Sequence, residues 1–328
     1  MTGLADLPGL QFELPKPDIS ALRAGNTGTE GVWHFESGVP GRRVMITALV
    51  HGNELCGAWA LKGLLEAGVR PQRGSLTLAF CNLAAFDRFD AAAFDASRFV
   101  DEDMNRQWSA ERIADATTVE RRRAGELLPF VEGADWLLDL HSMHEPGEPL
   151  LLVGPRTRNL ELARRLRAPE HVVVDEGHQD GTRMRDFGRF GLDDEEGGGT
   201  RSLLVECGFH GDTSSRDVAQ DLSARFLVEA QTVDVETVAE LLPGWRGPDA
   251  AQQWVLRVTG GVAARNDKFR FLGDYRGLEV IKKAGAPIGD NDGDIVSTPY
   301  DDCVLVMPSL RQLRAGVTVV RFARQEAL

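Results

Sequence analysis

The chain has 328 residues, of which 42% are hydrophobic and 27% are charged. This ordinary globular mix excludes a disordered chain or a fibre, and the length allows two domains of average size. The formal net charge of −13 disfavours nucleic acid or an anionic membrane as a partner, and because no signal peptide or membrane span is recognisable we expect a cytoplasmic protein.

Short apolar runs that alternate with helical patterns predict an α/β fold in the first two thirds of the chain. Four runs have the continuous apolar character of buried strands: residues 43–50, 75–81, 136–140 and 202–205. Helical patterns lie between or after them, at residues 56–65, 118–130 and 217–229. We therefore expect a mixed sheet flanked by helices on both faces.

The pattern changes after residues 242–248, which hold two prolines and two glycines. Short β-like runs follow at residues 254–258, 278–281, 303–307 and 317–322, separated by turn signals such as Asn291-Asp292-Gly293. We therefore expect two domains, residues 1–243 and a smaller β-rich domain of residues 250–328. An acidic, glycine-rich stretch at residues 191–200 is expected to form a surface loop.

His51 and Glu54, in the tetrapeptide HGNE, follow the first apolar run. In open α/β sheets ligands bind at the carboxyl ends of the strands, and an imidazole with a carboxylate suits Zn²⁺. His141 ends another apolar run, in DLHS, and completes a His₂Glu set that leaves a position open for water. The alternatives are a surface turn for HGNE and a packed histidine at a strand end for His141.

Two further segments have residue types that bind anions or move protons. Asn105 and Arg106 are adjacent, so a bend could bring both donors to one carboxylate. Glu206 closes an apolar run, and a buried carboxylate beside an activated water can act as a general base. The alternatives are a solvated charge run for residues 98–106 and a helix cap or ion-pair partner for Glu206.

In this order, the four segments resemble the succinylglutamate desuccinylase/aspartoacylase family of the zinc carboxypeptidase-like superfamily. The resemblance rests on HGNE, the R-x₄-D-x-N-R of residues 98–106, DLHS and VECG, and it covers residues 50–208. The tail from about residue 254 is similar to the family's extra C-terminal domain. The resemblance implies a zinc-carboxypeptidase-like fold in which residues 1–243 form a zinc-dependent catalytic domain.

The resemblance also implies a role for each residue at the reaction centre. His51, Glu54 and His141 would hold one Zn²⁺ per chain, which activates a water molecule. Glu206 would take the proton of the water and later pass it to the leaving amine. Arg98 would polarise the scissile carbonyl and stabilise its oxyanion.

The resemblance extends to substrate binding. Asn105 and Arg106 would hold the substrate carboxylate, and Asp103 would accept the free N–H of His51. Thr182-Arg183 is the best match for an arginine that binds a second carboxylate, although two rivals lie nearby, Arg185 and Arg189. His144, three residues after His141, is open as a metal ligand or as a residue that lines the pocket.

The expected activity is deacylation, the hydrolysis of the amide bond of an N-acyl amino acid or a related small carboxylated N-acyl amine. A metallocarboxypeptidase acting on short peptides is one alternative, which an added domain at the entrance disfavours. A zinc-binding protein without hydrolytic activity is another, but binding zinc alone requires neither Glu206 nor Arg98. The sequence leaves open the acyl group, the amine and whether the chain forms a homo-oligomer.

Overall fold

The computed structural model describes residues 2–3, 7, 9–177 and 180–328. The larger N-terminal part contains these elements: β1 (Val32–Glu36), β2 (Arg43–Ala48), α1 (Leu55–Glu66), β3 (Ser75–Phe80), α2 (Leu83–Asp87), α3 (Ala110–Asp115), α4 (Val119–Gly133), β4 (Trp136–Met143), β5 (Leu150–Leu152), α5 (Thr157–Leu166), β6 (His171–Val174), β7 (Arg201–Phe209), α6 (Thr213–Glu229) and α7 (Val235–Leu241). Short 3₁₀ helices add Ser20–Leu22, Ala91–Ser97, Met104–Arg106, Met184–Asp186 and Gly188–Phe190. The C-terminal part contains β8 (Trp254–Ala263), β9 (Arg270–Phe271), β10 (Val280–Ile281), β11 (Pro287–Asn291), β12 (Asp294–Ser297), β13 (Cys303–Val306) and β14 (Thr318–Ala327).

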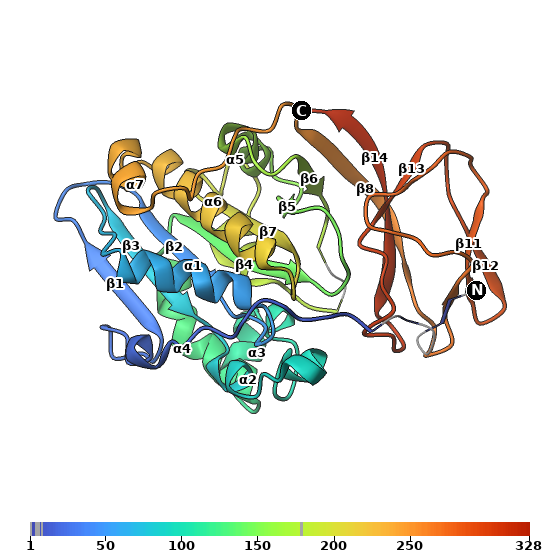
Figure 1. Cartoon of the computed structure of the whole chain (residues 1–328), viewed down its shortest axis with the longest axis horizontal. Coiled ribbons are helices and arrows are strands. Elements are labelled where there is room, and N and C mark those ends of the chain that lie inside the picture. Colours follow the sequence, from blue (N-terminus) through green and yellow to red (C-terminus); the bar gives the residue numbers. More distant parts are fainter. Residues whose placement is uncertain (1, 4–6, 8, 178–179) are drawn as a thin grey trace.

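One mixed sheet of eleven strands runs through the molecule in the order β1-β3-β2-β4-β7-β5-β6-β8-β14-β13-β10 (Figure 1). Strands β3, β2, β4 and β7 are parallel, whereas β1 at one edge is antiparallel to β3, and β5 is antiparallel to β7 and parallel to β6. The carboxyl ends of β2, β4 and β7 therefore meet at one edge of the sheet. The expected fold class, a mixed sheet flanked by helices with a smaller β-rich C-terminal part, is confirmed.

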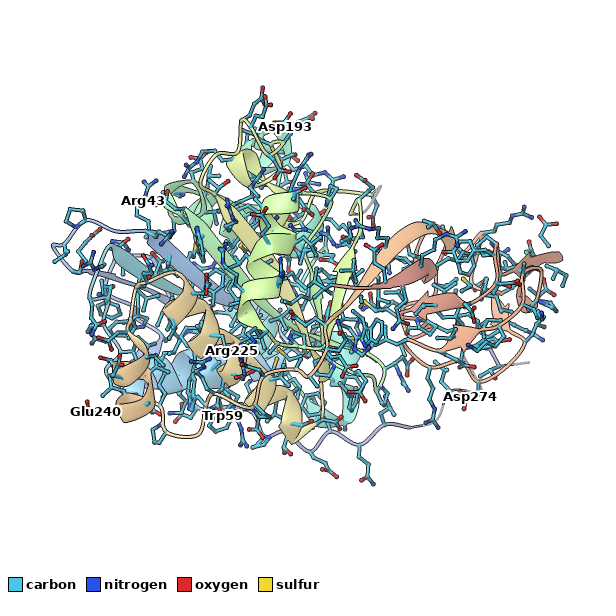
Figure 2. The ribbon with its side chains drawn as sticks, turned by 90° about the horizontal axis from the view of Figure 1, so that it is seen from above. Arg43, Trp59, Asp193, Arg225, Glu240 and Asp274 are labelled. Atoms are coloured by element: carbon cyan, nitrogen blue, oxygen red, sulfur yellow. The ribbon has the colours of Figure 1, made fainter. Side chains whose placement is uncertain are left out.

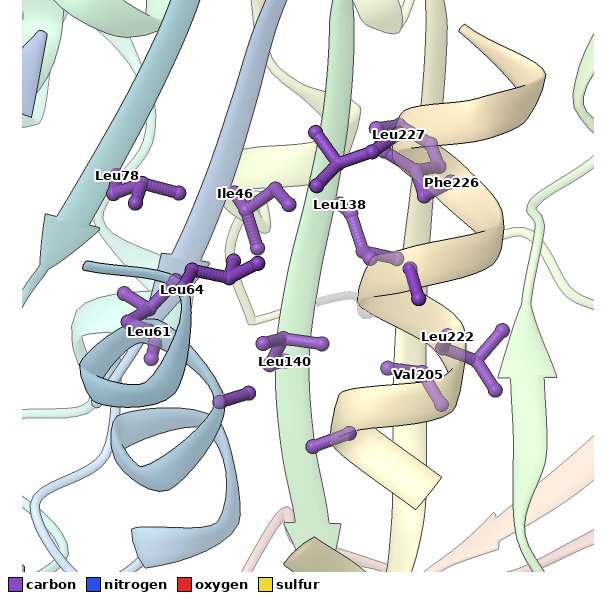
Figure 3. Close-up of a cluster of buried hydrophobic side chains, with 14 of the residues drawn as sticks. Ile46, Leu61, Leu64, Leu78, Leu138, Leu140, Val205, Leu222, Phe226 and Leu227 are labelled. Carbon is purple, nitrogen blue, oxygen red and sulfur yellow. The ribbon is translucent and has the colours of Figure 1, made fainter. Parts of the chain in front are cut away.

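The two faces of the sheet bury alternate side chains of the same strand. Ile46 of β2 belongs to a cluster that α1 and α6 cover, whereas its neighbour Met45 packs in a second cluster against α4. Figure 3 shows the first cluster, in which Leu138 and Leu140 of β4 lie between side chains of α1 and α6. Burial of each such side chain contributes about 1.5–3 kcal/mol, which holds the strand ends in place.

Strands β4 and β7 extend beyond the apolar runs from which they were predicted. They end at Met143 and Phe209, and His141 pairs with Glu206 inside the sheet. The apolar runs stop where the side chains become polar, but the backbone hydrogen bonds continue past that point. The predicted site residues of these strands are therefore held by sheet pairing.

The β-rich part is joined to the larger part by backbone pairing. Strand β8 pairs in parallel with β6 and antiparallel with β14, so the central sheet continues into the C-terminal part (Figure 1). Asp292 and Gly293 have φ angles of 58° and 93° and form the two-residue turn between β11 and β12. The turn signal is confirmed, whereas the boundary between residues 243 and 250 stays a prediction.

The outer surface carries the acidic loop expected at residues 191–200. Asp193 of this loop lies at the outer edge of the molecule, and Asp274 lies at the margin of the C-terminal part (Figure 2). Among the residues that the structure describes, no helix combines the length and apolarity that a membrane crossing requires.

Candidate metal centre and active-site cavity

Three side chains converge at the carboxyl edge of the sheet. His51 and Glu54 follow β2, and His141 lies in β4. Nδ1 of His51 lies 2.8 Å from Oε1 of Glu54, and Nδ1 of His141 lies 2.7 Å from Oε2 of the same carboxylate. One ligand atom from each residue lies within 4.8 Å of the others, and all three residues are buried. Two imidazoles and one carboxylate in this geometry form a candidate metal centre.

Each histidine directs its other ring nitrogen at a carboxylate behind it. Nε2 of His51 donates to Oδ1 of Asp103 over 2.9 Å, and Nε2 of His141 donates to Oδ2 of Asp139 over 2.8 Å. The hydroxyl of Thr47 donates to the other oxygen of Asp139 over 2.7 Å. Such carboxylates keep the protons on Nε2, so the Nδ1 lone pairs are available to a metal. The residues present therefore fit a bound divalent metal.

The glycine of HGNE is required by the backbone that passes over it. A Cβ atom at Gly52 would lie 2.3 Å from the carbonyl carbon of Ala85 and 2.5 Å from the carbonyl oxygen of Ser97. The N–H of Gly52 also donates to the carbonyl oxygen of Arg98 over 3.0 Å. The missing side chain thus lets the segment that carries Arg98 lie directly beside the metal ligands.

A buried carboxylate on α4 fixes the path of residues 98–106. The side chain of Glu120 is fully buried and accepts hydrogen bonds from the N–H groups of residues 100–102, over 2.7, 3.1 and 3.3 Å. These bonds satisfy three consecutive backbone donors in a segment without regular structure. The charge run of residues 98–106 is consequently an ordered wall of the site.

Arg98 places a positive charge against the metal ligands. Its Nη1 donates to Oε1 of Glu54 over 3.1 Å, and its Nη2 donates to Oδ2 of Asp103 over 3.2 Å. Burial alone would lower the pKa of Arg98, but Asp103 and Glu54 outweigh it and raise this pKa. Burial alone would likewise raise the pKa of Asp103, but His51 and Arg98 hold it well below its usual range. Arg98 therefore stays charged where it can polarise a carbonyl.

Glu206 lies beside His141 on the neighbouring strand and is buried. Its Oε2 atom makes no hydrogen bond with any residue in the described part of the chain. Burial and the nearby charge of Glu54 raise the pKa of Glu206 to about 8. A carboxylate with a raised pKa and an unused oxygen is suited to accept and return a proton near neutral pH.

Asn105 and Arg106 lie together on one 3₁₀ turn beside the centre. The side-chain oxygen of Asn105 accepts from the N–H of Met184 over 2.9 Å, and its nitrogen lies 3.5 Å from Nε2 of His141. Arg106 lines the cavity and donates from Nε to Asp180 over 3.0 Å. Because Asp180 is more than half exposed, with a side-chain exposure of 57%, an anion can compete with it for Arg106.

The three arginines proposed for a second carboxylate lie in different places. Arg183 lines the cavity, but its guanidinium is paired with Asp175 over 3.1 Å and with Asp186 over 2.5 Å. Arg185 points into the interior, where Nη2 donates to main-chain carbonyls. Arg189 is half-exposed and donates to the carbonyl oxygen of Ala134 over 2.9 Å. Only Arg183 of these three lies among the cavity residues, and two carboxylates already neutralise it.

His144 lies beside Arg98, outside the group of three ligands that converge. Its Nε2 lies 3.2 Å from Nη1 of Arg98, and its Nδ1 lies 3.0 Å from a carboxylate oxygen of Asp95 and 3.3 Å from Nε2 of His210. His210 is fully buried and contacts the hydroxyl of Ser142 over 2.8 Å. Burial lowers the pKa of both histidines, so both stay neutral at pH 7.

These groups open into one cavity of about 660 Å³ between the larger part and the C-terminal part. Arg321 of β14 lines it, and its charge interacts with those of Asp175 and Glu206. The C-terminal part therefore supplies a charged residue to the site. The sequence alone assigns no residue of the C-terminal part to the site, because β14 reaches the cavity only through its pairing with β8.

Comparison with known proteins agrees with this geometry. Residues 40–200 match the succinylglutamate desuccinylase/aspartoacylase catalytic domain. This stretch, just under half of the chain, is similar to the catalytic domain of that family. The resemblance seen in HGNE, residues 98–106 and DLHS is thus confirmed, whereas VECG lies just beyond the matched residues. No curated protein matches the chain.

Several solved structures share the fold of this chain. Succinylglutamate desuccinylase from Vibrio parahaemolyticus has 16% sequence identity and a TM-score of 0.63, over 90% of this chain and 86% of that chain. A succinylglutamate desuccinylase/aspartoacylase from Rhodobacter sphaeroides has 16% identity and a TM-score of 0.62, over 90% and 88%. The product-bound ectoine utilization protein EutE (DoeB) from Ruegeria pomeroyi has 15% identity and a TM-score of 0.58, over 89% and 87%.

Four residues beside the candidate site were not predicted from the sequence. Asp139 had a usable signal, because residues two apart on a strand share a face and it precedes His141 by two. Glu120, Asp95 and His210 had none, because no local sequence pattern indicates which groups their side chains contact. Their contacts depend on how separate elements pack.

Proposed function

We propose that this protein is a zinc-dependent amidohydrolase that deacylates an N-acyl amino acid or a related small carboxylated N-acyl amine. One observation carries the proposal. The Nδ1 atoms of two histidines converge on Glu54, and the buried carboxylate of Glu206 lies on the adjacent strand with an unbonded oxygen. Family membership, with its succinylglutamate desuccinylase/aspartoacylase catalytic domain, supports a deacylase.

His51, Glu54 and His141 are the residues that would hold the zinc ion. When bound there, Zn²⁺ supplies Lewis-acid activation of a water molecule and of the scissile carbonyl. Asp103 and Asp139 keep the two imidazoles in the tautomer that leaves Nδ1 free. Zinc is favoured by the donor set, because two imidazoles, one carboxylate and an open position are typical of catalytic zinc.

Glu206 moves the proton in this proposal. Its raised pKa, about 8, allows it to accept the proton of the attacking water and to hold it near neutral pH. It then donates the same proton to the leaving nitrogen, so the products are a carboxylate and an amine. Arg98, held by Glu54 and Asp103, provides positive charge for the oxygen that becomes negative during the attack.

Arg106 orients the substrate by its carboxylate, with Asn105 beside it. The guanidinium can bind a carboxylate through two parallel hydrogen bonds, and its present partner Asp180 is exposed enough to be displaced. Arg183 stays a weaker candidate for a second carboxylate, because Asp175 and Asp186 already pair with it. The cytoplasmic location and a homo-oligomer stay predictions.

The experiment measures metal content and amine release together. We expect stoichiometric zinc in the parent and its loss in His51→Ala and His141→Ala. Glu206→Gln should retain zinc but lose about 10²–10⁴-fold in turnover, because an amide cannot accept the proton. The substrates tested for amine release should include N-acyl amino acids and short peptides, so that a deacylase is distinguished from a peptidase. Each assay is run with and without a chelator.

Two results would contradict the proposal. Full zinc content in both histidine variants would remove the ligand assignment. Turnover of Glu206→Gln within about twofold of the parent would exclude Glu206 as the base, since such groups normally contribute at least ~10²-fold.

A further inference from the structure

Two neighbouring strands of the central sheet separate at the cavity. Strand β6 pairs with residues 254–257 of β8 and ends at Val174. Directly beyond this point, residues 175–177 after β6 and residues 258–261 of β8 all line the cavity. The cavity therefore begins where the pairing of β6 with β8 ends, and it lies beside the continuation of β8.

The continuation of β8 has one backbone edge that no strand covers. On one side it pairs with β14. On the other side, residues 258–262 have no backbone hydrogen bond to any residue that the structure describes. Residues 259–261 are also exposed. An uncovered strand edge presents N–H and C=O groups to any extended chain that comes beside it.

Gly261 directs both of its backbone groups toward the uncovered edge. The N–H of Ala264 donates to the carbonyl oxygen of Val317, on the β14 side, over 2.8 Å. Because the backbone groups of successive residues point to opposite sides of a strand, those of Ala263 and Gly261 point away from β14. The carbonyl oxygen of Ala263 accordingly accepts from the side chain of Asn291 over 3.0 Å. Gly261 therefore offers one donor and one acceptor at the edge.

Gly261 lies close to the proposed reaction centre. It is opposite Arg321 in the ladder of β8 with β14. Arg321 lines the same cavity and is near enough for its charge to interact with those of Glu206 and Arg106. Because Gly261 has no side chain, a ligand backbone can approach this strand closely. The edge and the reaction centre are therefore close enough for one extended ligand to contact both.

The ligand group that matches such an edge is an amide. An amide carries one N–H donor and one C=O acceptor, as each residue of a strand does, and extended peptides bind to sheet edges in this way. An aliphatic chain would displace water from Gly261 without replacing its hydrogen bonds. At the ~30 Å³ of one liquid water molecule, a cavity of about 660 Å³ holds about 20 non-hydrogen atoms. This is more than one acetylated amino acid contains.

We propose that the substrate carries a second amide group near the scissile one, and that this second amide pairs with the N–H and C=O groups of Gly261. The proposal rests on the deacylase function above, and it narrows the substrate to an N-acyl amino acid extended by a further amide. The second amide can belong to the acyl group or to the amine portion. Two pairs of ligands distinguish these sources.

The first pair is N-(acetylglycyl)alanine and N-(4-oxopentanoyl)alanine, in which a methylene group replaces the N–H of the second amide. The second pair is N-acetylalanylglycine and its analogue with a methylene group in place of the glycine N–H. We measure Kd by calorimetry with zinc-loaded Glu206→Gln, and kcat/KM with the zinc-loaded parent, where the amine released identifies the bond that is cut. In one pair we expect the amide to bind about fivefold more tightly than its analogue, the effect of one net hydrogen bond.

Gly261→Pro removes the N–H donor without breaking the ladder, because this N–H points away from β14. Proline is tolerated in strands where its nitrogen faces no partner strand. In the Glu206→Gln background, it should weaken binding of the responsive amide about fivefold relative to Gly261→Ala and leave N-acetylalanine unchanged. Gly261→Ala is the matched control, because it retains the donor and adds the same Cβ atom, 3.2 Å from the carbonyl oxygen of Val320.

The proposal is overturned if the amide and its methylene analogue bind equally in both pairs, a result that does not depend on how well Gly261→Pro folds. Equal binding of the responsive amide to the folded proline and alanine variants would also overturn it. Release of alanine from N-acetylalanine in either case would leave the deacylase function standing. Conversely, a fivefold preference in Kd without amine release from any of these compounds would support the edge and contradict the deacylase function.

Discussion

Nη1 of Arg98 donates a hydrogen bond to Nε2 of His144 over 3.2 Å. The other nitrogen of the imidazole lies 3.0 Å from Asp95, so the ring is neutral, with its proton on Nδ1 and its Nε2 lone pair directed at Arg98. His144 therefore holds the guanidinium in one orientation. This explains a second histidine so close to His141 without requiring it to bind metal.

Replacing His144 should damage the chemical step more than substrate binding. We expect His144→Ala to lower kcat about tenfold with little change in KM, because a misplaced Arg98 stabilises the oxyanion less well. His144→Gln, whose side-chain oxygen can accept the same hydrogen bond, should recover part of the loss. Steady-state kinetics of both variants measures this.

The background of Arg98→Ala provides the control. If His144 acts through Arg98, then His144→Ala should have almost no additional effect in that background. An equal tenfold loss in both backgrounds would show that His144 has an independent role.

The carboxylates behind the two histidines should determine metal affinity. We expect Asp103→Asn and Asp139→Asn each to weaken zinc binding about 10–100-fold, because an amide oxygen orients the imidazole less firmly. Competition with a fluorescent chelator measures the dissociation constant. Asp101→Asn is the control from the same segment, because its carboxylate accepts only from the N–H of Val119 among the hydrogen bonds found. Unchanged affinity in both test variants would contradict the prediction.

A free carboxylate on the substrate should be required at Arg106. We expect the parent to hydrolyse an N-acyl amino acid much faster than its methyl ester, because the ester offers Arg106 no carboxylate in place of Asp180. Arg106→Ala should remove most of this preference, a change of about 2–5 kcal/mol in selectivity. Arg106→Lys should recover only part of it, because lysine binds without the two-pronged geometry. Equal kcat/KM for acid and ester in the parent would contradict the prediction.

The buried pair of Asp175 and Arg183 should make stability depend on pH in acid. Burial alone would raise the pKa of Asp175, but Arg183 outweighs it and lowers this pKa from 3.8 to about 2. The folded protein therefore binds this proton less readily than the unfolded chain. The stabilisation, about 2 kcal/mol, is complete above about pH 5 and is lost as the pH falls from about 4 to about 2.

Urea unfolding of Asp175→Asn checks this. The free-energy difference from the parent should be constant between pH 5 and 7 and should shrink by about 2 kcal/mol towards pH 2. Asp302→Asn is the exposed control, since Asp302 pairs with Lys282 at the surface. It should cost less than about 1 kcal/mol at every pH. A constant difference for Asp175→Asn down to pH 2 would contradict the assignment.

The sequence predicts the convergence of His51, Glu54 and His141 for a physical reason. His51 and His141 follow apolar runs that must be buried in the sheet, and parallel strands bring their carboxyl ends together. Because β2 and β4 pair in parallel, the histidines that follow or end these strands come close to each other in the fold. Glu206 is placed by the same rule, although its strand continues past the apolar run to Phe209.

The sequence predicts the surroundings of the ligands poorly. Residues 98–106 have the composition of a solvated surface segment, but contacts with distant residues such as Glu120 order them as a wall of the site. Arg183 is of a residue type that often binds carboxylates, but its charge is already neutralised by Asp175 and Asp186. No periodic sequence pattern predicts such pairs, because the two side chains come together only through tertiary packing.

The pairing of β6 with β8 has a consequence for any attempt to study the larger part alone. A truncation after residue 243 would strip β6 of the partner on its outer side and leave that edge of the sheet unpaired. It would also uncover Val173 and Leu204, which pack against side chains of the C-terminal part. An open edge beside an apolar patch recruits other chains, so the truncated protein should aggregate, and we expect the larger part to need the C-terminal part for its solubility.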